Sequence, residues 1–211
     1  MFITLDGPSG VGKSTTVRAL HDELILRSLT VRRTSEPSGG DIGRFIRNHF
    51  HHIRGHALAC LVAADRYEHV AHEIQPWLAE GDTVVCDRYI ASTLVMQRLD
   101  GVPLKFLLAL TADAPRPDLA VILTADADLI AQRIADRGPA NRFHRDPTAP
   151  AREVGLYSET AQALVAAGVR VLTVDTGAFT PGEIAERIAD AVFGSSVAST
   201  ASSPPTTSQG Q

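Results

Sequence analysis

The segment Gly7-Pro-Ser-Gly-Val-Gly-Lys-Ser14 has the residue types and the spacing of a phosphate-binding loop. It satisfies G-x-x-x-x-G-K-[ST], follows the short apolar run Phe2–Leu5 and precedes a segment with helical periodicity. Glycines permit close backbone approach to phosphate oxygens, and successive N–H groups at a helix N-terminus cradle an anion. Lys13 would add positive charge over the β- and γ-phosphates, and the Ser14 hydroxyl would face Mg²⁺. We therefore predict that the chain binds a nucleoside triphosphate.

An acidic residue and a basic residue, Asp87 and Arg88, directly follow a second apolar run, Thr83–Cys86. An aspartate after a strand is often only a turn former. In a protein with a phosphate loop, however, an acid at this place can hold the Mg²⁺ shell. We therefore predict Ser14 and Asp87 as Mg²⁺ contacts, either direct or through water.

Arginines crowd a later stretch of the chain, and they are Arg133, Arg137, Arg142 and Arg145. Gly138, Pro139 and Pro147 interrupt the helical pattern there. An arginine-rich flap beside a phosphate loop suits phosphoryl transfer, because it neutralises phosphate charge and excludes water. The alternative is a solvated basic loop. We predict a lid over about residues 135–150.

Apolar runs alternate with helical patterns along the chain. The expected strands are Phe2–Leu5, Leu29–Arg32, Thr83–Cys86, Leu119–Leu123 and Val169–Val174. The expected helices are Lys13–Arg27, Ala57–Ala79 as one helix or two, Ala127–Ala135, Glu153–Ala167 and Pro181–Phe193. Near-continuous apolar strands separated by helices indicate a parallel sheet that is covered on both faces. We predict an α/β fold of the P-loop NTPase type.

Length and composition limit the other possibilities. The 211 residues suit one domain, which we expect over residues 1–193. Residues 194–211 are rich in Ser, Thr and Pro without a charged residue, and we predict a disordered tail there. The net charge of −4 argues against a nucleic-acid partner, and no apolar run approaches the length of a membrane span. With only two cysteines and no signal-peptide pattern, we expect a cytoplasmic protein.

Several short segments together resemble the thymidylate kinase family. They are Leu5–Thr15, Thr34–Gly39, Ala63–Arg66, Asp87–Thr93 with Gln97, and Pro117-Asp118. They occur in that family's order and at about its spacing. The phosphate loop is shared with many NTPases, whereas Asp-Arg-Tyr followed by Ser-Thr and Gln is much more specific. The resemblance covers roughly residues 2–190. It implies a five-stranded parallel sheet with a lid, ATP and Mg²⁺, a nucleotide acceptor with dTMP first among them, and a homodimer.

The resemblance also implies roles on the ATP side. Arg133 matches a family position, and Gly10 falls where one branch of the family has a catalytic arginine. Without that arginine the family places the charge on the lid, where Arg137 and Arg142 are the candidates. The residues expected to contact ATP are Gly7, Ser9, Gly10, Val11, Gly12, Lys13, Ser14, Thr15 and Arg133. Those expected to act in catalysis are Lys13, Arg88, Arg137 and Arg142.

On the acceptor side, the resemblance implies that Arg88 holds the acceptor phosphate and that Arg66 contacts the base or its phosphate edge. Asp6 would sit near the acceptor sugar and the metal. The expected acceptor-binding residues are Asp6, Glu36, Pro37, Val62, Arg66, Arg88, Ser92, Met96 and Gln97.

The chain departs from the family pattern mainly in the acceptor pocket. Ser35 replaces an Arg, Val62 replaces a Phe that stacks on thymine, and Met96 replaces a Tyr near the sugar. The lid has Asn141-Arg-Phe-His144, where the family commonly has Asp-Arg-Phe-Glu. These changes fit either a thymidylate kinase with local compensation or a relative that acts on a different or modified nucleotide.

Other functions stay open at this point. One is a P-loop kinase for a nucleoside or a small metabolite. Another is a regulatory P-loop ATPase in which hydrolysis controls partner binding. The Asn-Lys-x-Asp that reads the base in GTPases is absent, since no Asn-Lys pair occurs in the chain.

Overall fold

A computed structural model describes residues 1–137 and 146–194, with only the backbone of Arg137. Part of the predicted lid, with Arg142, and all but the first residue of the predicted tail lie outside the described residues. Among the described helices, none has the length and apolar character that crossing a membrane requires.

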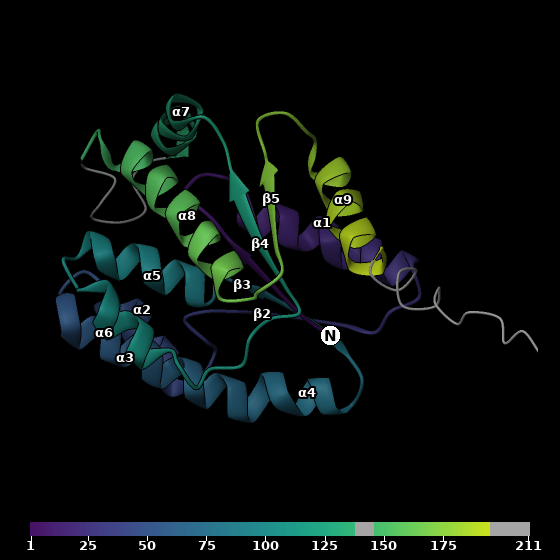
Figure 1. Ribbon diagram of the computed structural model, residues 1–211, viewed down its shortest axis with the longest axis horizontal. Helices are drawn as coiled ribbons and strands as arrows, with labels where there is room; N and C mark the ends of the chain where they lie inside the picture. Colours follow the sequence, from purple (N-terminus) through teal and green to yellow (C-terminus); the bar gives the residue numbers. More distant parts are fainter. Residues whose placement is uncertain (138–145, 195–211) are drawn as a thin grey trace, which may run out of the picture.

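The described residues form a central five-stranded parallel sheet in the order β2-β3-β1-β4-β5 (Figure 1). The strands are β1 (Phe2–Asp6), β2 (Val31–Ser35), β3 (Thr83–Asp87), β4 (Leu119–Thr124) and β5 (Val171–Asp175). The helices are α1 (Lys13–Leu26), α2 (Asp41–His49), α3 (Gly55–His69), the π-helix η1 (Val70–Ile74), α4 (Gln75–Ala79), α5 (Ile90–Leu99), α6 (Leu104–Leu110), α7 (Ala127–Arg137), α8 (Ala149–Ala166) and α9 (Pro181–Phe193). The predicted α/β fold with a parallel sheet is confirmed.

Alternating side chains of the strands divide the core between the two faces of the sheet. Ile3, Leu5 and Val85 pack against α1 and α9, which contribute Leu20 and Ile188. On the opposite face, Phe2, Val84 and Cys86 pack against η1 and its neighbours. Helices α5 and α8 cover the same face farther along, through Val95, Ile122 and Tyr157. Burial on both faces explains why these strands read as continuous apolar runs.

The second strand is displaced from its predicted place. Leu29–Arg32 was expected, whereas β2 spans Val31–Ser35 and pairs in register with β3. Ser28 has a left-handed φ of 65° and ends α1, so Leu29 belongs to the connection and packs against the core. The strand continues through polar residues because it lies at the sheet edge, where backbone pairing with β3 holds it.

Helices α2, α5 and α6 were not predicted, and α8 begins four residues before the expected Glu153. Helix α2 has Ile42, Phe45 and Ile46 at helical spacing, but it is only nine residues long and buries only Gly43 and Ile46. Helix α5 is buried around most of its surface, which removes the one-sided pattern that marks a surface helix. The predicted segment Ala57–Ala79 is present as the continuous run α3–η1–α4.

Candidate active site

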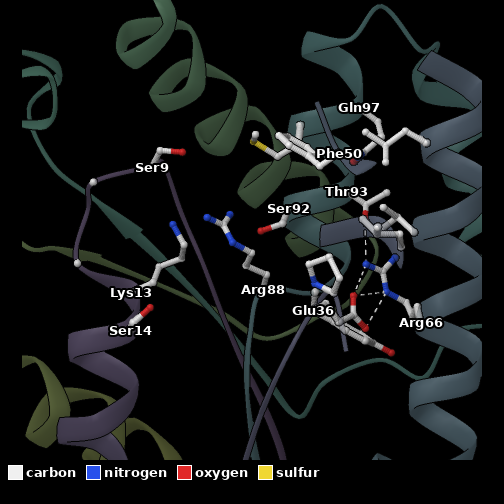
Figure 2. A pocket seen from close by; sticks show the side chains of 18 of the residues that line it. Ser9, Lys13, Ser14, Glu36, Phe50, Arg66, Arg88, Ser92, Thr93 and Gln97 are labelled. Carbon is white, nitrogen blue, oxygen red and sulfur yellow. Dashed lines mark hydrogen bonds and ion pairs between the residues drawn. The ribbon is translucent and has the colours of Figure 1, made fainter. Parts of the chain in front are cut away.

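A cavity of about 560 Å³ opens beside the carboxyl ends of β1 and β3, which lie next to each other in the sheet. This edge is where ligands of parallel sheets usually bind. Figure 2 shows Lys13 and Ser14 at one end of the cavity and Arg66, Thr93, Gln97 and Phe50 at the other, with Arg88 and Ser92 between them. The predicted site residues that line it are Ser9, Gly10, Gly12, Lys13, Ser14, Thr15, Glu36, Pro37, Val62, Arg66, Arg88, Ser92, Met96, Gln97 and Arg133.

The phosphate loop is held in shape by glycine and by Lys13. Gly7 has a φ of 154°, and a Cβ there would lie 2.4 Å from the Leu123 carbonyl oxygen, so a side chain does not fit. The Lys13 ammonium donates hydrogen bonds of 2.7 Å to the carbonyl oxygens of Gly7 and Pro8. Burial and the positive charge of Arg88 together lower the pKa of Lys13 to about 7. Lys13 is therefore a buried amine whose charged form is disfavoured in the free protein.

This pKa predicts a pH dependence of nucleotide binding. In the free protein Lys13 loses its proton near pH 7, whereas bound phosphates would favour the ammonium form and raise its pKa. Binding above pH 7 then takes up a proton. The affinity for MgADP should fall as the pH rises, by close to tenfold per pH unit at most. Calorimetric titration between about pH 7.5 and 9 measures the dependence, in a range where the phosphates are already ionised.

Lys13→Arg is the matched control, because a guanidinium stays charged throughout this range. Its affinity for MgADP should be independent of pH. A wild-type affinity that is equally constant would contradict the lowered pKa.

Ser14 and Asp87, the two residues predicted as Mg²⁺ contacts, lie next to each other. The Ser14 hydroxyl donates a 2.9 Å hydrogen bond to Asp87 Oδ2. The second carboxylate oxygen, Asp87 Oδ1, is buried without a hydrogen-bond partner among the described residues. Mg²⁺ in nucleotide sites takes oxygen ligands, usually one or two carboxylates together with substrate phosphates. The oxygen atoms of Ser14 and Asp87 are therefore suitable ligands for Mg²⁺.

Arg88 combines an unusual backbone with an uncommitted side chain. Its φ of 73° lies in the left-handed region, which is rare for a residue with a Cβ and marks functional sites. Its backbone N–H donates to the Leu5 carbonyl oxygen at 2.9 Å. No hydrogen bond or ion pair joins its guanidinium to the described residues. Figure 2 shows the guanidinium pointing toward the space beside Lys13.

Arg66 forms a buried ion pair at the far end of the cavity. Its Nη2 donates to Glu36 Oε2 at 2.6 Å and to Thr93 Oγ1 at 2.8 Å, and its Nε donates to Glu36 Oε2 at 2.9 Å. Its Cζ lies 4.9 Å from the centroid of the Tyr89 ring. Its Nη1 is buried and has no hydrogen-bond partner among the described residues. Arg66 thus keeps one donor uncommitted.

Asp6 lies behind the cavity wall and does not line the cavity. Its Oδ1 accepts hydrogen bonds of 2.9 Å from the backbone N–H groups of Tyr89 and Ser92, at the start of α5. These donors have no partner within the helix, and α5 has no side-chain cap of its own. A carboxylate is favoured at this end of a helix dipole. Burial nevertheless raises the pKa of Asp6.

The remaining ATP-side residues lie around the loop. Arg133 donates to Thr176, whose hydroxyl donates to the Val11 carbonyl oxygen at 2.8 Å. Arg137 ends α7, its side chain lying outside the described part, as Arg142 does.

Sequence reasoning missed several residues at the site, and three of them bear on its chemistry. Thr93 and Phe50 line the cavity, and the buried Glu153 accepts a 2.7 Å hydrogen bond from the Ser9 backbone N–H. Glu153, Tyr157 and Thr160 are all buried and recur at helical spacing, so this spacing was a usable signal. Thr93 also sits one position after Ser92 in a segment already singled out. Phe50 had no such signal.

Comparisons with known proteins agree with the geometry. Residues 5–178 match the family model described as thymidylate kinase. A probable thymidylate kinase from Caldivirga maquilingensis is 38% identical over 150 residues, which are 69% of this chain and 73% of the relative. A thymidylate kinase from Clavibacter sepedonicus is 36% identical over 189 residues, 84% of this chain and 87% of the relative. The chain therefore belongs to the thymidylate kinase family.

Proposed function

We propose that this chain transfers the γ-phosphoryl group of ATP to dTMP and so forms dTDP and ADP. The observation that supports this acceptor is the set of uncommitted polar atoms at the end of the cavity opposite the phosphate loop. Membership of the family supports the reaction type.

The polar atoms at this end match the edge of a thymine base. Arg66 Nη1 is a buried donor without a partner among the described residues, and the Thr93 hydroxyl, which accepts from Arg66, keeps its own proton to donate. Gln97 Oε1 is a buried acceptor without a partner in the same set. Thymine offers the O4 carbonyl to donors and its neighbouring N3–H to an acceptor. Cytosine instead places an amino group where the donors lie, which leaves donors facing donors.

Transfer would need no side-chain nucleophile. An oxygen of the acceptor phosphate attacks the γ-phosphorus while the bond to the β,γ-bridging oxygen breaks. Arg88 would hold the acceptor phosphate and Lys13 the phosphates of ATP, so positioning and charge neutralisation supply the rate. Arg137 and Arg142 would add positive charge from the lid. Ser14 and Asp87 would hold Mg²⁺, which neutralises phosphate charge when bound.

A coupled assay for ADP release tests the proposal with dTMP, dUMP, dCMP, dGMP and thymidine as acceptors. We expect dTMP to give the highest kcat/KM and dCMP a value lower by roughly 10,000-fold, the penalty for leaving buried polar groups unpaired. Stimulation by another acceptor but not by dTMP would overturn the assignment. ATP hydrolysis that exceeds transfer to every acceptor would favour a regulatory ATPase instead.

Replacing Arg88 should affect the binding of dTMP and leave the binding of ATP almost unchanged. Arg88→Ala removes the cation assigned to the acceptor phosphate, so the KM for dTMP should rise roughly 30-fold or more. The KM for ATP should change little, and Arg88→Lys should retain part of the affinity because it keeps the charge. Steady-state kinetics with each substrate varied in turn measures both constants. Unchanged acceptor kinetics in Arg88→Ala would contradict the assigned role.

The proposal extends to assembly and location. We propose a homodimer, because the family resemblance implies one and because Tyr67, Leu104 and Leu108 expose apolar surface on α3 and α6. The Tyr67 hydroxyl donates to the Leu110 carbonyl oxygen, which joins these helices into one surface. We also propose that residues 1–193 are the kinase domain and that it works in the cytoplasm.

A further inference from the structure

Two aromatic side chains are among the described residues that line the cavity, Tyr89 and Phe50. Tyr89 is 1% exposed and is already engaged by its neighbours. Its ring makes an edge-to-face contact with the ring of Phe2, at a centroid distance of 5.0 Å. The Arg66 guanidinium lies over the Tyr89 ring, and the Tyr89 hydroxyl donates to the Pro115 carbonyl oxygen. Phe50 makes an edge contact with the ring of His51 at a centroid distance of 5.6 Å, and unlike Tyr89 it is only half-buried. Phe50 is therefore the lining aromatic residue that can present its ring to a ligand.

Phe50 lies at the end of the cavity where the base-reading atoms are. Figure 2 shows its ring near Gln97, on the side of the cavity away from Lys13. Arg66, Thr93 and Gln97 would meet the edge of a base there, so its flat faces must lie against the apolar wall. That wall contains Ile46, Phe50, Leu58, Val62 and Met96. An aromatic ring stacks on a base more favourably than aliphatic side chains do.

We propose that Phe50 is the platform on which the acceptor base stacks. This inference rests on the proposed function, and it assigns base affinity to the residue that directly follows α2. Val62, which lines the same wall from α3, offers no ring. The site would then obtain its stacking surface from the C-terminal end of α2.

Close contacts of α2 with its surroundings would fix the position of this ring. A Cβ on Gly43 would lie 2.2 Å from the Ser38 carbonyl oxygen and 2.8 Å from Asp65 Oδ1, so only glycine fits. Asp65 in turn accepts hydrogen bonds of 2.7 and 2.6 Å from the backbone N–H and the hydroxyl of Ser38. Ile46, one turn before Phe50, is buried. Gly43 thus acts as a positioning residue for Phe50.

Substitution of Phe50 tests the platform directly. Phe50→Leu should raise the KM for dTMP about tenfold, change kcat by less than about twofold and leave the KM for ATP unchanged. Phe50→Tyr, which keeps the ring, should retain wild-type affinity. The matched control is Phe45→Leu, because Phe45 lies on the preceding helix α2, is 45% exposed and does not line the cavity. A dTMP KM within about twofold of wild type in Phe50→Leu would overturn the proposal.

Moving the aromatic ring to another position tests whether lost stacking, and not a changed local fold, causes the loss of dTMP affinity in Phe50→Leu. Val62→Phe in the Phe50→Leu background should recover most of the lost dTMP affinity, because the ring returns from the α3 side. Gly43→Ala should raise the KM for dTMP in the wild-type background and add little in Phe50→Leu. Full additivity would show that Gly43 does not act through Phe50. Thermal unfolding of every variant confirms that the compared proteins are folded.

The failure of this inference can be told apart from the failure of the proposed function. The acceptor that the panel selects is used for every variant. If dTMP is inactive and another nucleotide is used, the proposed acceptor is wrong. If the selected nucleotide binds Phe50→Leu and wild type equally well, the assignment of Phe50 as the stacking platform is wrong.

Discussion

Lys13→Ala should lower kcat by roughly 100- to 1,000-fold while the fold remains intact. The ammonium is the cation assigned to the phosphates of ATP, and it lies in the loop that forms the phosphate end of the cavity. In the free protein its bonds go to the carbonyl oxygens of Gly7 and Pro8. Burial lowers the pKa of Lys13 to about 7, because the buried ammonium group costs free energy. Replacing Lys13 by alanine also removes this cost. Single-turnover kinetics and thermal unfolding measure the two effects separately.

The chain offers one matched control for this substitution, because Lys105 is its only other lysine. Lys105 lies on α6, is exposed and does not line the cavity. Lys105→Ala should have wild-type kcat and wild-type stability. Near-normal turnover in Lys13→Ala would refute the role assigned to Lys13.

Arg66→Met should destabilise the protein by about 3–5 kcal/mol, because it leaves the buried Glu36 carboxylate without its cation. For a domain of this size, that corresponds to a decrease in Tm of roughly 6–20 °C. It should also abolish measurable use of dTMP at ordinary concentrations. Chemical denaturation at about pH 8 gives the free energy of unfolding.

Two further variants isolate the burial of the charge as the cause. Arg98→Met breaks the more exposed pair with Glu159, and its cost should stay below about 1 kcal/mol. The double variant Glu36→Gln with Arg66→Met removes both charges, so it should recover part of the stability lost in Arg66→Met. Equal costs for Arg66→Met and Arg98→Met would contradict this explanation.

The phosphate end of the site could be predicted because its residues follow short-range rules. Gly7, Lys13 and Ser14 belong to one contiguous motif. Asp87 comes next to Ser14 because β1 and β3 are neighbouring parallel strands, whose carboxyl ends meet at one edge of the sheet. The central strands could be predicted from their apolar runs, because both of their faces are buried.

The acceptor end depends on tertiary contacts that leave little trace in local sequence. Phe50 reaches the cavity only because Gly43 lets α2 approach Ser38 and Asp65. The absence of an aromatic residue at position 62 was visible in the sequence, but the placement of the Phe50 ring just after α2 was not. The edge strand β2 was misplaced for a similar reason, since its register comes from pairing with β3.

The bonds of Asp6 have a consequence for the choice of acceptor. One carboxylate at the end of β1 holds the start of α5, so the strand that carries the phosphate loop and the helix that carries Ser92 and Thr93 form a single frame. The distance between the loop and the base-reading side chains is then fixed, so it limits the length of the acceptor that can be phosphorylated. We expect a nucleoside to be too short to reach across it and a nucleoside diphosphate to be too long. Molecular length, as much as the chemistry of the base, would thus decide which nucleotide is phosphorylated.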